Sequence, residues 1–147
     1  MGERLRADRA ADGDEMSEID ADVSRSYSRI TGAPLVIVVC TDARVTDHYP
    51  DRRRNEAEYL MAVQSTAMAV QNLLLAAQSE GLGACVMCAP LFCPDTVADA
   101  LYLPREWKAQ MLVTIGEAAR RGSERPRLAP EEIAIWVSGA RLRPPGS

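Results

Sequence analysis

The sequence has 147 residues, enough for one domain with a buried core. The net charge of -4 disfavours a nucleic-acid binder that works by neutralising phosphates. No run of 18 or more consecutive residues is entirely apolar, so no membrane-spanning helix is expected. The charged N-terminus lacks the apolar stretch of a secretory signal. Four cysteines without such a signal predict reduced thiols in a cytoplasm.

The first 32 residues predict one clear helix. Residues 1–16 are rich in arginine, aspartate and alanine, which favours a disordered segment or a frayed helix. From Ser17, four apolar residues recur at helical spacing, and Gly32 is the expected end of that helix. These four residues are Ile19, Val23, Tyr27 and Ile30.

The middle of the chain predicts a strand followed by a long helix. Six apolar residues, 35–40, indicate a strand that is buried on both faces. A loop over residues 41–54 leads to a helix over residues 55–80. No charged residue lies between Glu58 and Glu80, so we expect this helix inside the structure. Gly81 is the expected left-handed residue just after its end.

Shorter elements are expected in the rest of the chain. Residues 84–88 and 110–115 predict two strands, and a helix between them should begin near Cys93 and end before Pro104. The inward-facing residues of that helix should be Val97, Ala98 and Leu101. Residues 130–136 predict a helical turn, and residues 139–147 a disordered tail. The expected domain therefore covers residues 17–138, with α+β or α/β layers around one central helix.

Several segments, taken in order, resemble the nitroreductase family of flavoenzymes across residues 17–136. They are residues 61–65, 69–77, 80–85, 101–104, 115–116, 125–127 and 130–133. The resemblance implies an α+β, nitroreductase-like fold in three layers, with a central apolar helix and a mainly antiparallel sheet. It also implies an FMN-dependent oxidoreductase that forms a homodimer, with each flavin at the subunit interface.

Residues 87–95, together with Tyr49, Pro50 and Asp51, resemble one subgroup more closely. This subgroup is the nitroreductase-like C-terminal domain of the bifunctional deazaflavin-coenzyme biosynthesis enzyme, a glutamate ligase and dehydro-coenzyme reductase. The resemblance implies reduction of a dehydro form of the coenzyme, or of another small conjugated acceptor. The electron donor would be a nicotinamide or a deazaflavin.

One part of the family pattern is missing from the sequence. Family members open with an arginine-serine-arginine segment that holds the FMN phosphate, followed by a segment that contacts the flavin ring. Nothing in residues 1–16 resembles either segment. We therefore expect an N-terminally truncated version of the fold. The alternative is a non-catalytic remnant, or a dimerisation partner, that keeps the fold without its own flavin.

The resemblance implies two groups of cofactor-binding residues. The loop of Ala89, Pro90 and Leu91 would line the isoalloxazine ring, where a backbone N–H can tune the flavin's N5. Arg125 and Arg127 would grip the FMN phosphate through paired N–H groups. The alternatives are an ordinary strand-to-helix turn and solvated loop charges. No catalytic residue can be named from the sequence.

Other polar residues favour structural roles. Gln64, Gln71 and Asn72 should bond to neighbouring backbone or across a dimer interface. The pair Cys85 and Cys88 lacks the second pair that a zinc site needs, so both should be buried small hydrophobes and no metal is expected.

Two features of the loop before the long helix remain open to more than one interpretation. His48 is the only histidine, and a lone loop histidine is usually solvated. Residues 52–54 are three arginines that could contact an anionic substrate or could form a solvated start of the helix.

Overall fold

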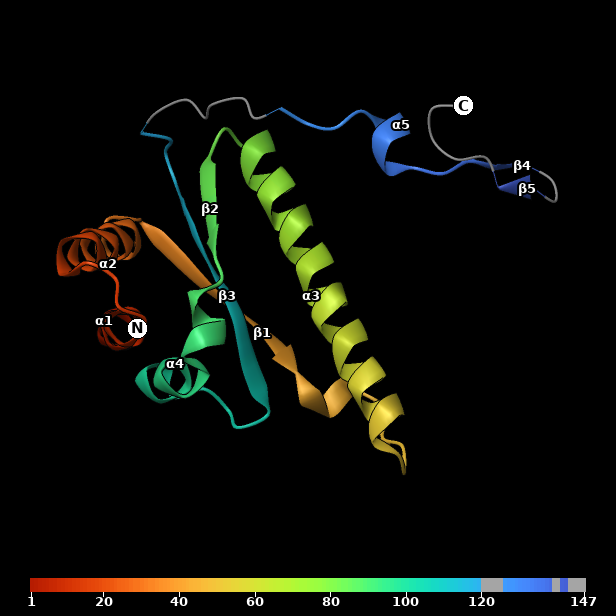
Figure 1. Ribbon diagram of the computed structural model, residues 1–147, viewed down its shortest axis with the longest axis horizontal. Coiled ribbons are helices and arrows are strands. Elements are labelled where there is room, and N and C mark those ends of the chain that lie inside the picture. The colour runs from red at the N-terminus through yellow and green to blue at the C-terminus, as the bar shows by residue number, and fades with distance from the viewer. Residues whose placement is uncertain (120–125, 139–140, 143–147) are drawn as a thin grey trace.

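A three-layer arrangement is evident in the computed structural model, which describes residues 1–119, 126–138 and 141–142. The middle layer is an antiparallel sheet in the order β1-β3-β2. Helix α3 lies on one side of it, and helices α1, α2 and α4 lie on the other (Figure 1). The bounds are α1 Gly2–Ala11, α2 Met16–Thr31, β1 Leu35–Asp42, α3 Arg52–Ser79, β2 Gly83–Met87, α4 Pro94–Leu101 and β3 Trp107–Gly116. The predicted α+β fold with a central helix and an antiparallel sheet is confirmed.

The central strand β3 carries the core on both of its faces. Val113 is fully buried and packs with Val70 and Ala77 of α3. On the opposite face, Ala109 packs with Val97 of α4 and with Cys93 just before it. Strand β1 divides its side chains in the same way, because successive residues of a strand point to opposite faces. Two-sided packing is therefore confirmed for the middle of β1, although its first residue, Leu35, is half exposed.

A β-bulge interrupts the pairing of β1 with β3. Val39 pairs with Met111 and Cys40 pairs with Ala109, so Gln110 is an extra residue in β3. The buried Gln110 side chain donates from Nε2 to the Lys108 carbonyl at 3.1 Å and to the Tyr59 hydroxyl of α3 at 3.4 Å. The bulge therefore places Ala109 on the α4 side and ties the sheet to α3.

Helix α3 begins and ends where its capping residues allow. The Asp51 carboxylate accepts a hydrogen bond from the Arg54 N–H at 3.0 Å, so the helix starts at Arg52 rather than at residue 55. Gly81 follows its end with φ of 74°, which confirms the predicted left-handed residue. A second polar contact holds α3 to the sheet, because the hydroxyls of Thr41 and Thr66 lie 2.9 Å apart.

The expectation that α3 is enclosed is wrong for the single chain. Only Val70 and Ala77 are fully buried, while Met61, Met68 and Leu75 are 53%, 63% and 60% exposed. One side of α3 packs against β1 and β2, and the other is uncovered. The helix is also long and apolar enough, by length and composition, to cross a membrane. Its apolar composition alone could not show whether its own chain or another molecule covers it.

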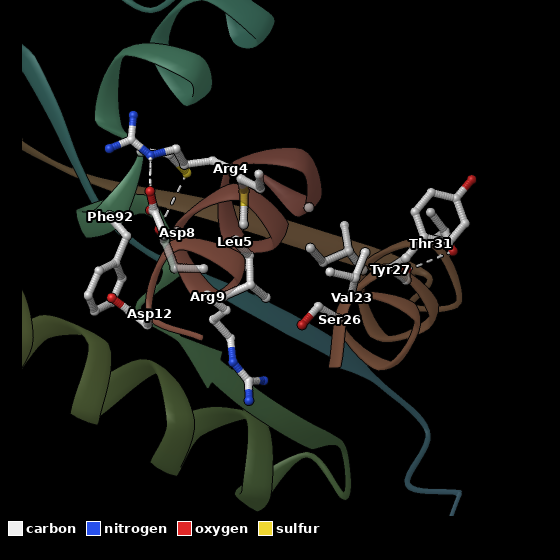
Figure 2. Close-up of a pocket in the computed structure, with 15 residues that line it drawn as sticks. Arg4, Leu5, Asp8, Arg9, Asp12, Val23, Ser26, Tyr27, Thr31 and Phe92 are labelled. Atoms are coloured by element: carbon white, nitrogen blue, oxygen red, sulfur yellow. Dashed lines mark hydrogen bonds and ion pairs between the residues drawn. The ribbon is translucent and has the colours of Figure 1, made fainter. Parts of the chain in front are cut away.

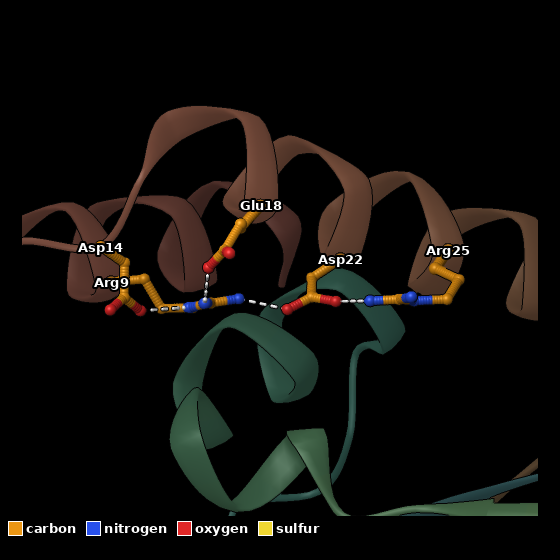
Figure 3. A network of polar contacts seen from close by, with 5 residues as sticks. All are labelled: Arg9, Asp14, Glu18, Asp22 and Arg25. Carbon is orange, nitrogen blue, oxygen red and sulfur yellow. Dashed lines mark hydrogen bonds and ion pairs between the residues drawn. The ribbon is translucent and has the colours of Figure 1, made fainter.

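Helices α1 and α2 pack against each other and are joined by ion pairs. Figure 3 shows the Arg9 guanidinium reaching from α1 to Asp14, Glu18 and Asp22, and Asp22 also pairs with Arg25. Residues 2–11, expected to be a frayed helix or disordered, thus form α1. Helix α2 begins after Glu15 rather than Ser17 and is followed by Gly32, as predicted.

The C-terminal part differs from expectation in detail. Helix α4 ends at Leu101 because Tyr102 adopts a left-handed conformation with φ of 51°. Leu101 is 47% exposed, so its predicted inward position is wrong. The predicted turn over residues 130–136 is a shorter helix, α5 (Pro130–Ile133), followed by strands β4 (Val137–Ser138) and β5 (Arg141–Leu142). Most of the predicted tail, residues 139–147, lies outside the described residues.

Candidate functional site

The predicted flavin-contacting loop is a short 3-10 helix, η2, which covers Ala89–Phe92. It follows β2 directly, packs against the central strand β3 and leads into α4. Pro90 is fully buried, Ala89 is partly buried, and Leu91 is half exposed. Of the three predicted residues, Ala89 and Leu91 are therefore accessible to a ligand, while Pro90 is packed in the core.

Few backbone N–H groups of η2 are free to donate a hydrogen bond to a flavin. Proline has no N–H, so Pro90 contributes no donor. The Leu91 N–H donates to the Cys88 carbonyl at 3.1 Å, within the turn itself. Among the described residues, no acceptor is found for the Ala89 N–H. Ala89 is thus the residue of this loop whose backbone is best placed to donate to a bound ring.

The predicted phosphate-binding arginines are not gathered at this loop. Arg125 lies outside the described residues. Arg127 is exposed and precedes α5, which lies beyond the upper end of α3 and away from η2 (Figure 1). One chain, as described, therefore does not bring Arg127 and η2 into a single flavin site.

The amides and cysteines are more exposed than the sequence suggests. Gln64, Gln71 and Asn72 all lie on the uncovered side of α3, so they are not buried amides within one chain. The prediction that Cys85 and Cys88 are buried is wrong: Cys85 lies on the edge strand β2, Cys88 lies between β2 and η2, and both are exposed. All four cysteines are free thiols. Among the described residues, no group of three or more potential ligands is placed to hold a metal.

Two of the three arginines at the start of α3 pair with neighbouring acidic residues. Arg52 pairs with Glu56 at 2.5 Å, and Arg54 pairs with Asp51 and lies over the Tyr49 ring, 4.6 Å from its centre. The N–H and guanidinium of Arg54 hold the pKa of Asp51 below its usual value. These contacts favour the solvated start of a helix over an anion site. His48 is exposed in the same loop.

Asp42, at the end of β1, is the most strongly perturbed carboxylate in this region. Hydrogen bonds from the Arg44 side chain and backbone N–H lower its pKa to about 2. A carboxylate with a lowered pKa stabilises the folded state above its usual pKa of 3.8, and this stabilisation is lost as the pH falls toward 2. The Asp42 carboxylate thereby also fixes the direction of the loop that leads to α3.

Asp42→Asn should therefore lower the urea midpoint at about pH 6, with the difference from the parent protein shrinking steadily below about pH 4. Urea unfolding followed by circular dichroism over this pH range measures the difference. Asp47→Asn, at an exposed position of the same loop, is the control and should show no such trend. If the difference in urea midpoint between the parent and Asp42→Asn grew toward acid pH, the lowered pKa of Asp42 would be contradicted.

A cavity that the sequence did not predict lies beside η2. We call it the α1–α2 cavity; its volume is about 500 Å³, and α1, α2 and η2 form its walls. Figure 2 shows Leu5 of α1 and Val23 of α2 between the two helices, with Phe92 at one end and Tyr27 at the other. The helical stripe that includes Val23 and Tyr27 was the available signal, but its spacing indicated only a core-facing helix.

The sequence profile described as the nitroreductase family matches residues 4–117, well over half of the chain. The chain belongs to the nitroreductase family. The match begins within α1 and ends just after β3, so it includes α2, α3, η2 and α4.

Solved structures share the same fold. A putative oxidoreductase from Bacteroides fragilis is 25% identical with a TM-score of 0.62, over 77% of this chain and 48% of its own. The NfrA1 nitroreductase from B. subtilis is 21% identical with a TM-score of 0.59, and the match covers 73% of this chain and 47% of NfrA1. A variant of NfnB from Sphigopyxis sp. strain HMH is 19% identical with a TM-score of 0.56, and the match covers 93% of this chain and 57% of NfnB. NfnB is described as an FMN and NADPH-dependent nitroreductase. The chain thus spans about half the length of these proteins.

Proposed function

We propose that this chain works as an FMN-dependent oxidoreductase of the nitroreductase type, acting on a small molecule. The observation that carries the proposal is the family match over residues 4–117, which includes the η2 turn and the central helix. FMN would supply the hydride chemistry, and the chain would bind and orient it. Ala89 and Leu91 of η2 are the residues that would face the ring, and Arg127 would hold the phosphate.

The proposed active form is a homodimer, because a single chain leaves matching surfaces uncovered. Met61, Met68 and Leu75 recur at seven-residue spacing along the exposed side of α3, a spacing at which helices pair. No charge interrupts this surface between Glu58 and Glu80, so a second copy could cover it without burying an ion.

The C-terminal arm, residues 126–138, supports the same assembly. It extends past α3 and away from the sheet (Figure 1), and it exposes large apolar side chains. These are Leu128, Ile133, Ile135, Trp136 and Val137. Such a surface on an extended arm favours burial against another copy. A partner's arm could then supply to this chain's η2 the arginine that its own arm does not bring there.

The proposed electron acceptor is the dehydro form of a deazaflavin coenzyme precursor, with another small conjugated molecule as the broader class. The resemblance of residues 49–51 and 87–95 to the deazaflavin-coenzyme enzyme supports this choice. The proposed donor is a nicotinamide or a deazaflavin, and the relative described as NADPH-dependent supports the former. The cytoplasm is the proposed compartment, which the four free thiols support.

The second candidate is a remnant that keeps the fold without a flavin of its own. The separation of Arg127 from η2 within one chain favours it. FMN binding separates the two candidates. An enzyme should take up FMN and show its reduction by a nicotinamide under anaerobic conditions, whereas a remnant should do neither.

Arg127→Ala should weaken FMN binding about tenfold or more, because it removes a charge-assisted hydrogen bond to the phosphate. Quenching of flavin fluorescence measures the affinity. Riboflavin lacks the phosphate, so its affinity should be unchanged by the substitution. Arg29→Ala, at an exposed position of α2, is the matched control and should leave both affinities unchanged. Equal losses for FMN and riboflavin would contradict the phosphate role, and no FMN binding by the parent protein would favour the remnant.

A further inference from the structure

The α1–α2 cavity is a partly open cleft, because Tyr27 and Phe92 at its two ends are 69% and 76% exposed. This cavity measures about 500 Å³, within the range of clefts that bury small ligands. Its walls are mainly apolar, with Leu5 from α1, Val23 and Ile30 from α2, and Ala89 and Phe92 from η2. The size and the lining are those of a binding site for a small apolar molecule.

The two arginines beside the cavity already have partners. Arg4 pairs with Asp8 at 2.9 Å, and this hydrogen bond raises the pKa of Arg4. Arg9 pairs with Asp14 at 2.6 Å and with Asp22 (Figure 3). The other charged side chain of the lining, Asp12, is exposed to solvent. An anion in the cavity would lose its hydration without gaining a free guanidinium, and a cation would meet only a carboxylate that water already solvates. The electrostatics therefore favour an uncharged ligand.

Helix α1 forms one wall of the cavity. It has no buried residue, and ion pairs join it to α2: Arg6 pairs with Asp20 at 2.7 Å, and the partly buried Arg9 pairs with Asp22. Met1, just before α1, packs against the core cluster that includes Cys93. Tyr27 and Phe92 at the two ends of the cavity are largely exposed, so a ligand can enter there without unfolding of the core.

We propose that the α1–α2 cavity binds an uncharged, mainly apolar molecule with one or two aromatic rings, and that α1 covers it. Tyr27 and Phe92 stand at its two ends, where aromatic side chains can pack against rings (Figure 2). The Ser26 hydroxyl also lines the cavity and offers one polar contact. The site lies on the side of the sheet opposite α3 and shares Ala89 with the turn proposed to face the flavin. It goes beyond the proposed flavin chemistry because the cavity is present without a cofactor, and its test uses protein free of FMN.

The uncharged probe N-phenyl-1-naphthylamine tests the proposal by its fluorescence, which rises in apolar surroundings. The parent protein should bind it saturably. Val23→Trp fills the space between α1 and α2 and should weaken binding about tenfold or more. Val45→Trp adds the same ring at a position of η1 (Ala43–Val45) that is 79% exposed, and should leave the affinity unchanged. Equal affinity in the parent and Val23→Trp would overturn the proposal.

A second measurement needs no variant of the cavity. Cys93 lines the cavity and is only 7% exposed, whereas Cys85 and Cys88 are exposed elsewhere. Bound probe should slow alkylation of Cys93 by N-ethylmaleimide severalfold, as followed by peptide mass spectrometry, without slowing Cys85 or Cys88. Unchanged alkylation of Cys93 at saturating probe would place the probe elsewhere and overturn the proposal, even if Val23→Trp failed to fold.

Discussion

Met68→Lys should convert the proposed homodimer into a monomer, with the dimer Kd rising at least about a hundredfold. Met68 is 63% exposed near the middle of the uncharged side of α3. An ammonium group buried there would lose its hydration without a charged partner. In a twofold dimer each interface contains the substitution twice, so the free-energy cost of burying the ammonium group is doubled. Sedimentation analysis over a range of protein concentrations measures the change.

The matched control is Met16→Lys, at the start of α2 on the other side of the sheet. It adds the same charge to a methionine that is 49% exposed, so it should leave the Kd unchanged. A parent protein that stays monomeric at high concentration would contradict the dimer itself. A Met68→Lys protein that remains dimeric would show that the copies meet through a different surface.

Val113→Asp should lower the free energy of unfolding by at least about 4 kcal/mol. Val113 has no exposed surface, pairs with Ile37 on one side and Val86 on the other, and packs against α3. A carboxylate there would be buried without a partner. Since small domains are stable by only about 5 to 15 kcal/mol, this loss removes a large share of the stability. Circular dichroism and urea unfolding measure it.

Val45→Asp makes the same exchange at a 79% exposed position and should change the urea midpoint little. Val113→Ala, which removes two methyl groups without adding charge, should give an intermediate loss of about 2 kcal/mol. A folded Val113→Asp protein with a near-parental midpoint would mean that Val113 is not in the core.

Local sequence patterns predicted most helices and strands, because the formation of a helix or strand depends largely on residues that are close together in the chain. Gly81 ends the long helix in the expected left-handed conformation. The apolar run 35–40 lies within β1, and the extension of this strand to Asp42 follows from its pairing with β3, which no local pattern reveals. The burial of α3 could not be predicted in the same way, because an uncharged helix surface fits both a core and an interface.

The candidate site was only partly accessible to sequence reasoning. The position of the turn over residues 89–91, after a strand and before a helix, was predicted, and it forms η2. The inward direction of Pro90 depends on packing against β3 and was not predictable. The α1–α2 cavity escaped prediction because it exists only where α1, α2 and η2 meet, although Val23 and Tyr27 marked one of its walls.

The extra residue at Gln110 makes this point of β3 tolerant of a change in chain length. If Gln110 were deleted, Ala109 would directly precede Met111 in regular alternation, still paired with Cys40 and beside Cys93 and Val97. The loss would be the hydrogen bond from Gln110 to Tyr59, which holds α3 to the sheet. Natural relatives should therefore include strands that are one residue shorter at this position.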